Sequence, residues 1–252
     1  VDSLVERRQT GEPLQYVLGT WPFRTLELAV DPRVLIPRPE TEQLVEVALA
    51  ELRRVTAGPA KRPRRAVDLG TGSGAIALSL AVEGGSRHAG LEIWATDSSS
   101  VALDVARSNL EALPASDPCD NPTHRAPVHL AQGSWFAALP AHLVASIDLI
   151  VSNPPYVSAE EYPDLDPVVH DWEPEGALVA GPGSDGSAGL ADVETIIAGA
   201  PRWLTDGGAL VIELAPHQAE VAAALARRRG FVDVRVEPDL AGRPRALVAS
   251  KQ

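Results

Sequence analysis

The stretch Ile147-Asp148-Leu149-Ile150-Val151-Ser152, followed by Asn153-Pro154-Pro155-Tyr156, decides the fold of this chain. Its first six residues are mostly apolar and β-branched, and the two prolines cannot donate to a sheet ladder, so the pattern predicts a buried strand that ends at Asn153. Ligands of open α/β sheets bind at the carboxyl ends of the strands. The Asn-Pro-Pro-Tyr segment (153–156) is therefore a candidate site.

The chemistry of this segment suits one kind of ligand. The side-chain carbonyl of Asn153 and the main-chain carbonyl of Pro154 are acceptors, and neither proline has a competing N–H. Two rigid acceptors side by side can bind both hydrogens of a substrate –NH2, and Tyr156 offers a face for a planar group. We interpret the segment as a holder for a nucleophilic amino or amide nitrogen. The alternative is a strand followed by a proline-stiffened surface turn.

Strand and helix patterns alternate along most of the chain. Strands are predicted at 66–69, 91–96, 128–130, 147–152, 209–214, 231–236 and 246–250, with helices at 75–83, 101–113, 190–204 and 218–229 between them. This alternation predicts an α/β fold with a doubly wound, mostly parallel seven-stranded sheet.

The amino-terminal part reads differently. It contains the end of a helix (1–10), a strand over 23–30 in a small β-hairpin, an amphipathic helix that begins near Glu40, and a Pro/Arg-rich linker at 58–65. We expect two units: residues 1–35, a remnant of a helical region plus the hairpin, and residues 36–252, the catalytic domain. Because the chain has no methionine, even at position 1, we expect that a preceding segment is missing.

A glycine turn, Gly70-Thr71-Gly72-Ser73-Gly74, connects the first predicted strand to a helix, and Asp97 ends the next strand. Such a turn brings main-chain N–H groups close to a ligand, and the acid is placed to accept from two ribose hydroxyls. A nicotinamide dinucleotide, a turn without a ligand, and a capping role for Asp97 are the alternatives.

The nature of the nucleotide follows from the pairing with Asn153. If the sheet reverses direction between strands 66–69 and 147–152, the glycine turn and Asn153 share one pocket. A bound nucleophile needs an electrophile beside it, and a sulfonium methyl donor supplies one, whereas hydride transfer needs no such segment.

Together these motifs resemble a class I S-adenosylmethionine-dependent methyltransferase with a Rossmann-like fold. Within that class the chain resembles the HemK/PrmC family, which methylates the glutamine of the Gly-Gly-Gln motif in peptide chain release factors. The resemblance also rests on four further stretches: 11–16 (GEPLQY), 35–42 (LIPRPETE), 133–136 (GSWF), and Glu173-Pro174 with Ala177-Leu178.

This resemblance implies S-adenosylmethionine as cofactor, methyl transfer to the glutamine side-chain nitrogen, and release factors as partners. Gly70, Thr71, Gly72, Ser73 and Gly74 would hold its methionine end, Asp97 its ribose and Trp135 its adenine, and Asn153, Pro154, Pro155 and Tyr156 would hold the glutamine amide. Asn153, Pro154 and Tyr156 are the predicted catalytic residues, with Asn153 also near the cofactor. Two departures are Ser134, where the family often has Asp, and Ala215, where a Gly is usual.

Charge weighs against the main rival, an adenine-N6 DNA or RNA methyltransferase. The net charge is −12, and residues 66–252 carry 11 basic against 25 acidic side chains. Seven acids and no Lys or Arg fall within 159–175, and they would repel phosphates. We therefore expect no direct nucleic-acid contact. A binding module without catalysis is the second rival, and the two intact motifs argue against it.

The remaining composition points to the cytoplasm, and we expect a monomer. We find no membrane-length apolar run and no secretory signal, and the single cysteine, Cys119, excludes a disulfide framework. No metal is expected, because the six histidines are scattered without ligand spacing. They are His88, His124, His129, His142, His170 and His217.

Overall fold

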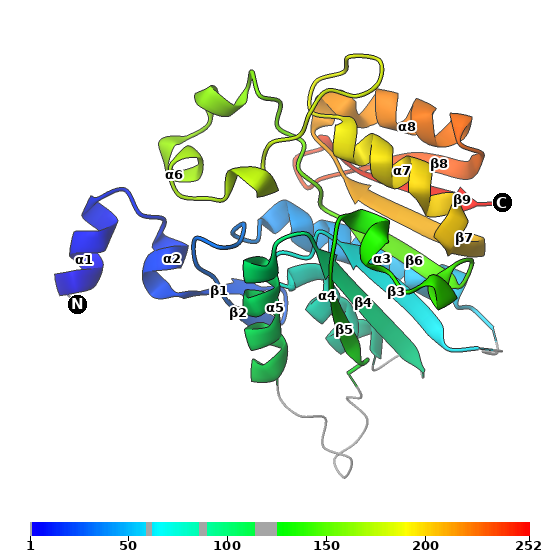
Figure 1. Cartoon of the computed structure of the whole chain (residues 1–252), viewed down its shortest axis with the longest axis horizontal. Helices are drawn as coiled ribbons and strands as arrows, with labels where there is room; N and C mark the ends of the chain where they lie inside the picture. The colour runs from blue at the N-terminus through cyan, green and yellow to red at the C-terminus, as the bar shows by residue number, and fades with distance from the viewer. Residues whose placement is uncertain (1, 59–61, 86–89, 114–124) are drawn as a thin grey trace, which may run out of the picture.

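A seven-stranded sheet forms the centre of the computed structural model, which describes residues 2–58, 62–85, 90–113 and 125–252 (Figure 1). The strand order is β5-β4-β3-β6-β7-β9-β8, and only β9 runs antiparallel to its neighbours. The strands are β3 (Arg64–Leu69), β4 (Leu91–Asp97), β5 (Val128–Gln132), β6 (Ile147–Ser152), β7 (Leu204–Glu213), β8 (Phe231–Pro238) and β9 (Pro244–Lys251). The predicted doubly wound, mostly parallel sheet is confirmed.

Helices cover both faces of the sheet. One face packs against α3 (Pro39–Val55), α4 (Ala75–Ser79) with its π-helical extension η1 (Leu80–Gly84), and α5 (Ser100–Ala112). The other packs against α7 (Ala191–Trp203), α8 (Ala219–Arg228) and the short 3-10 turns η2 (Trp135–Ala138) and η3 (Ala141–Leu143), and Figure 1 shows α7 and α8 side by side.

Strand β6 lies in the middle of these layers. Leu149 and Val151 belong to the core under α3 and α4, whereas Ile150 belongs to the core under α7 and α8. All three side chains are fully buried, because both faces of a central parallel strand are covered. Apolar residues on successive positions are the expected sequence pattern for such a strand.

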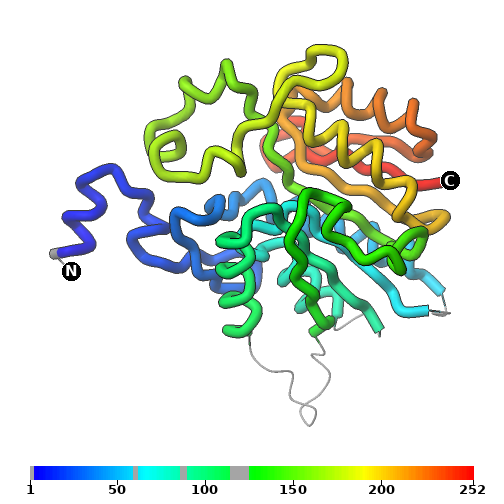
Figure 2. Tube along the Cα trace, viewed as in Figure 1, coloured from blue at the N-terminus to red at the C-terminus, as the bar shows by residue number. Residues whose placement is uncertain are grey.

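The amino-terminal part differs from the prediction in its details. It holds α1 (Asp2–Gln9), α2 (Leu14–Leu18) and a hairpin of β1 (Thr20–Phe23) and β2 (Leu26–Ala29). Figure 2 shows α1 and α2 at the end of the molecule away from the carboxyl terminus. The prediction of one strand over 23–30 was wrong, since Arg24 adopts a φ of 52° in the hairpin turn. Its guanidinium binds Glu83 at 2.6 Å and Glu46 at 2.9 Å, which holds that conformation.

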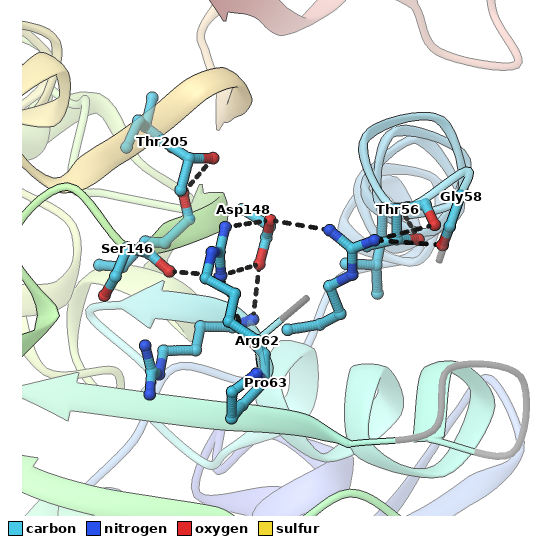
Figure 3. A network of polar contacts seen from close by, with 12 residues as sticks. Thr56, Gly58, Arg62, Pro63, Ser146, Asp148 and Thr205 are labelled. Atoms are coloured by element: carbon cyan, nitrogen blue, oxygen red, sulfur yellow. Dashed lines mark hydrogen bonds and ion pairs between the residues drawn. The ribbon is translucent and has the colours of Figure 1, made fainter. Parts of the chain in front are cut away.

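Asp148 anchors the predicted linker to the sheet (Figure 3). This β6 carboxylate is 2% exposed and accepts from the Arg62 guanidinium at 2.7 and 3.0 Å and from the backbone N–H of Arg65 at 2.9 Å. The guanidinium of Arg64 lies 3.7 Å away. The interpretation of 58–65 as a linker therefore needs correction, because β3 already begins at Arg64.

Residues 157–180 fold over the carboxyl ends of the strands. They contain η4 (Tyr162–Asp164), α6 (Pro167–His170) and η5 (Glu175–Ala177), and a bridge between Val157 and Val179 closes the segment. Two of its acids have structural roles: Asp166 caps α6, and the buried Glu173 pairs with Arg38 and accepts from the backbone N–H of Ile36 at 3.3 Å. This segment is therefore tied to the stretch that leads into α3.

Candidate active site

A cavity of about 390 Å³ lies at the point where the strand order reverses. From β3 the chain continues to β4 and β5 on one side, whereas β6 is followed by β7 on the other side. The loops after β3 and β6 therefore diverge and leave a crevice between them. The cavity is lined by Arg33, Val34, Leu35, Gly70, Gly72, Asp97, Ser98, Ser99, Ala102, Gly133, Ser134, Trp135, Asn153, Pro155, Pro174, Gly176, Ala177 and Asp192. The predicted shared pocket is thus present.

The glycine turn adopts a backbone that other residues tolerate poorly. Gly70 and Gly72, which line the cavity, have φ values of 75° and 56°, in the left-handed region. Gly70 also lies under an indole ring, because a Cβ there would stand 3.3 Å from Trp135 Cζ3. Neither position has a side chain that would fill this part of the cavity.

Buried polar contacts hold the turn in place. The N–H groups of Gly70 and Thr71 donate to the carbonyl of Thr96 at 2.9 and 2.8 Å. The fully buried Asp68 accepts from the Thr71 hydroxyl at 2.6 Å and from the N–H of Ala77 at 3.1 Å. Its second oxygen has no partner among the described residues, and burial raises the pKa of Asp68 to about 7.

Asp97 connects the glycine turn to the loop after β4. One carboxylate oxygen accepts from the N–H of Gly72 and the other from the N–H of Ser99, both at 2.9 Å. Each oxygen keeps a further lone pair for a ligand. The helix cap is Ser99, whose hydroxyl accepts from the N–H of Ala102, so the alternative role of Asp97 as that cap is wrong.

Trp135 lines the same cavity as Asp97. It has a φ of 47° at the start of η2, and its indole N–H donates to the carboxylate of Asp192. Burial raises the pKa of Asp192 above its usual range, and this hydrogen bond lowers it. The sequence analysis missed Asp192, because an acid in the first turn of a helix is usually explained by the helix dipole.

The Asn-Pro-Pro-Tyr segment lies across the cavity from the glycine turn. Ser152 at the end of β6 donates to the carbonyl of Leu69 at 2.6 Å, which joins the two strand ends. The side-chain NH2 of Asn153 donates to the Thr41 hydroxyl at 3.1 Å. Within the described residues no donor reaches Asn153 Oδ1 or the carbonyl of Pro154, so both predicted acceptors are available.

Hydrogen bonds on both sides of Tyr156 hold the Asn-Pro-Pro-Tyr segment in place. Tyr156 donates its N–H to the carbonyl of Leu178 at 3.2 Å, and its own carbonyl accepts from the Gln218 side chain at 3.1 Å. Burial raises the pKa of the Tyr156 hydroxyl to about 12, so the ring carries a neutral phenol.

Ala215 is one of the two departures from the family pattern. It has an ordinary extended backbone with a φ of −67°, so an alanine there creates no strain.

The predicted site residues fall into two groups. Those that line the cavity are Gly70, Gly72, Asp97, Trp135, Asn153 and Pro155. Those that do not line it, and instead shape its loops, are Thr71, Ser73, Gly74, Pro154 and Tyr156. The two groups together surround one cavity, and their individual roles stay predictions.

Two further predictions concern metal ions and membranes. Across residues 2–58, 62–85, 90–113 and 125–252 no group of three or more His, Cys, Asp or Glu side chains could hold a metal ion. Cys119, His88 and His124 lie outside the described residues. Among the helices of the described ranges, none has the length and apolar character needed to cross a bilayer.

Comparison with known proteins identifies the family. The profile of the Methyltransferase small domain matches residues 54–165. A release factor glutamine methyltransferase from Gloeobacter violaceus is 42% identical over 243 residues, which cover 96% of this chain and 76% of the relative. Its counterpart from Bordetella pertussis is 43% identical and covers 95% of this chain and 78% of the relative. The chain belongs to the release factor glutamine methyltransferase family.

A solved structure supports the fold of this family member. The methyltransferase from Pyrococcus furiosus superposes with a TM-score of 0.59 and 16% identity, covering 100% of this chain and 99% of that one. At this identity the likeness concerns the fold, and it agrees with the class I arrangement of the seven-stranded sheet. The recognition from sequence motifs and the predicted fold class are therefore both confirmed.

The cavity fits S-adenosylmethionine, the methyl donor of this family. Its volume of about 390 Å³ lies in the usual range for small-molecule sites. Asp97 keeps free lone pairs, Trp135 offers a flat face, and Asp192 adds a carboxyl group to the lining. These features are compatible with S-adenosylmethionine, and the part of the cofactor that each residue binds stays a prediction.

Proposed function

We propose that this chain transfers a methyl group from S-adenosylmethionine to the side-chain amide nitrogen of the glutamine in the Gly-Gly-Gln motif of peptide chain release factors. One observation carries the proposal. Asn153, whose uncharged side-chain carbonyl is free, lines the cavity that the glycine turn also lines, and the free carbonyl of Pro154 belongs to the next residue of the same loop. Neutral, paired acceptors match a neutral –NH2 group, and the family's curated members are named for the same reaction.

The chemistry supplied by S-adenosylmethionine is an electrophilic methyl carbon: its carbon–sulfur bond breaks as the carbon–nitrogen bond forms, leaving a neutral thioether, and the nitrogen loses one proton. An amide nitrogen is a weak nucleophile, because its lone pair is delocalised. Asn153 Oδ1 and the carbonyl of Pro154 would accept its two hydrogens, fix the direction of the lone pair and stabilise the positive charge that develops on nitrogen. Pro155 and Tyr156 would confine the planar amide.

The rival substrate, an adenine amino group, fits the same two acceptors. The surface around them argues for protein instead. The range 159–175 carries seven acids and no Lys or Arg, and Glu160, Glu175 and Asp164 are exposed there. A nucleic-acid backbone crossing this edge would be repelled. We also propose that the protein acts as a cytoplasmic monomer without nucleic acid, and that residues 1–35 form a unit distinct from the catalytic domain, residues 36–252.

Mass spectrometry of a release factor incubated with the protein and S-adenosylmethionine tests the activity. We expect a gain of one methyl group on the glutamine, and none on a release factor with glutamate at that position. In the Asn153→Ala variant kcat should fall about 10²–10³-fold, the usual loss when a preorganised polar group is removed. Turnover close to that of the parent in this variant, with an unchanged Tm, would contradict the role of Asn153.

A further inference from the structure

Three polar side chains form one hydrogen-bonded line that begins at Asn153 of the Asn-Pro-Pro-Tyr segment and continues through α3 to β7. Asn153 Nδ2 donates to Thr41 Oγ1 at 3.1 Å, and Thr41 Oγ1 donates to Glu213 Oε2 at 2.8 Å. Thr41 lies in the first turn of α3 and is 4% exposed, and Glu213 ends β7 and is 1% exposed. The line thus begins at the cavity and ends in the core.

The direction of these hydrogen bonds has a consequence for Asn153. A threonine hydroxyl has one hydrogen, and an ionised carboxylate can only accept. While Glu213 is ionised, Thr41 must therefore donate to it and can only accept from Asn153. The atom of Asn153 that faces Thr41 must then be Nδ2, which turns Oδ1 away from Thr41. A protonated Glu213 can donate instead, and this frees the hydroxyl hydrogen of Thr41 to bind Asn153 Oδ1.

We propose that Thr41 and Glu213 are positioning residues: the ionised carboxylate of Glu213, acting through the Thr41 hydroxyl, makes Asn153 present its carbonyl oxygen and not its NH2 to the substrate nitrogen. This inference rests on the proposed function for its purpose, since only an –NH2 substrate needs an acceptor there. It concerns the hydrogen bonding of Asn153 itself, however, and can be tested without the reaction.

The surroundings of Glu213 make its charge sensitive to pH. Burial raises the pKa of Glu213 to about 7, while the hydrogen bond from Thr41 and the positive charges of Arg245 and Arg38 lower it and Glu40 raises it. The neutral phenol of Tyr156 is the other titratable group in this surrounding. Arg245 comes from β9, and Arg38 and Glu40 stand at the start of α3. Glu213 therefore ionises as the pH rises through about 7, and the proposed orientation of Asn153 would form over the same pH range.

The same line explains the stretch Pro37-Arg38-Pro39-Glu40-Thr41, which the cavity does not account for. Pro39 begins α3, where its missing N–H is no loss, and Arg38 pairs with the buried Glu173. The Arg38–Glu173 pair fixes the first turn of the helix relative to the segment after β6. Thr41 is thereby held within hydrogen-bond distance of Asn153.

Nuclear magnetic resonance of protein labelled with ¹⁵N-asparagine tests this orientation directly. The chain has three asparagines, Asn109, Asn121 and Asn153, and an Asn153→Ala sample assigns the signal. We expect the side-chain NH2 signals of Asn153 to shift with pH, with a midpoint near 7. The shift should be absent from Glu213→Gln and Thr41→Val and should persist in Thr41→Ser, which keeps the hydroxyl.

Kinetics of the same variants provide the second readout. Thr41→Val should lower kcat about 10–100-fold, the usual loss for an outer partner of a site residue, and Thr41→Ser should recover most of it. In the parent, kcat should rise with pH through about 7, and Glu213→Gln should lose this rise. A merely structural role would lower stability without changing the pH profile.

The outcomes separate the two proposals. If the Asn153 signals do not titrate, or titrate equally in Glu213→Gln, the positioning role is overturned even in an active enzyme. Unchanged kcat in a folded Thr41→Val variant overturns it too. If the signals behave as expected and no methyl group reaches the release factor glutamine, the hydrogen-bond line stands and the proposed function fails.

Discussion

Replacing Glu213 by glutamine is expected to stabilise the fold at high pH and to change it little at low pH. Burial raises the pKa of Glu213 from 4.5 to about 7, so the folded state binds this proton more tightly than the unfolded chain does. The stability that follows from the bound proton is complete below pH 4.5 and is lost as pH rises through about 7. A neutral glutamine of the same shape has no such loss.

The size of the effect follows from the two pKa values. One pKa unit corresponds to 1.36 kcal/mol, so the change from 4.5 to about 7 is worth about 3 kcal/mol. The pKa of about 7 already includes two contacts that lower it, the hydrogen bond from Thr41 and the charge of Arg245. At pH 8.5 the Glu213→Gln variant should therefore exceed the parent by about 3 kcal/mol in free energy of unfolding, and at pH 4.5 the two should nearly coincide.

Urea unfolding of both proteins between pH 4.5 and 8.5 measures this difference. Glu160→Gln is the matched control, because Glu160 is an exposed acid on the surface segment after the Asn-Pro-Pro-Tyr segment. Asp68, whose pKa is also raised to about 7 by burial, contributes equally to parent and variant and cancels. Parallel stability curves for the parent and Glu213→Gln over this range would refute a proton held by Glu213 near neutrality.

Two further predictions concern the cofactor site and the fold. Gly70→Ala should weaken S-adenosylmethionine binding about tenfold or more, as measured by calorimetry, because the added Cβ would stand in the cavity wall 3.3 Å from Trp135. Gly90→Ala is the matched control. Gly90 has the same φ of 75° with open space around it, so its replacement should leave binding unchanged. Asp148→Ala should lower the free energy of unfolding by about 2–3 kcal/mol, since Arg62 and the N–H of Arg65 lose a buried partner. An equal loss in Asp104→Ala, which removes an exposed ion pair, would contradict this reasoning.

The sheet and the positions of its loops could be predicted because both depend on local patterns. Apolar strands, glycine turns and prolines are visible in sequence, and the order of strand and helix limits the possible topologies. The predicted strand 147–152 coincides with β6. The hairpin was harder, because its turn depends on Arg24 in a left-handed conformation, held by Glu83, a residue far along the chain.

The supporting residues of the site could not be predicted for a related reason. Thr41 and Glu213 are 172 positions apart and meet only in the folded sheet. In sequence, Thr41 is an ordinary residue of a helix start. Glu213 follows the apolar run 209–212 at the end of a strand, so it suggests a structural acid. Asp192 likewise suggests a helix-dipole partner until Trp135 is seen to donate to it.

The two ends of the sheet distinguish structural from functional acids. At the amino ends of the strands, Asp148 is surrounded by arginines and accepts three hydrogen bonds from Arg62 and Arg65. A buried charge needs such partners to be tolerated in the fold, so this acid is explained by stability alone. At the carboxyl edge, one oxygen of Asp68 has no partner within the described ranges, and the hydrogen bonds to Glu213 come from a single hydroxyl. An apolar residue would pack more favourably at either place. Because these two incompletely paired acids lie beneath the two loops that form the cavity, their cost to stability is best explained by what they orient: the glycine turn above Asp68 and Asn153 above Glu213.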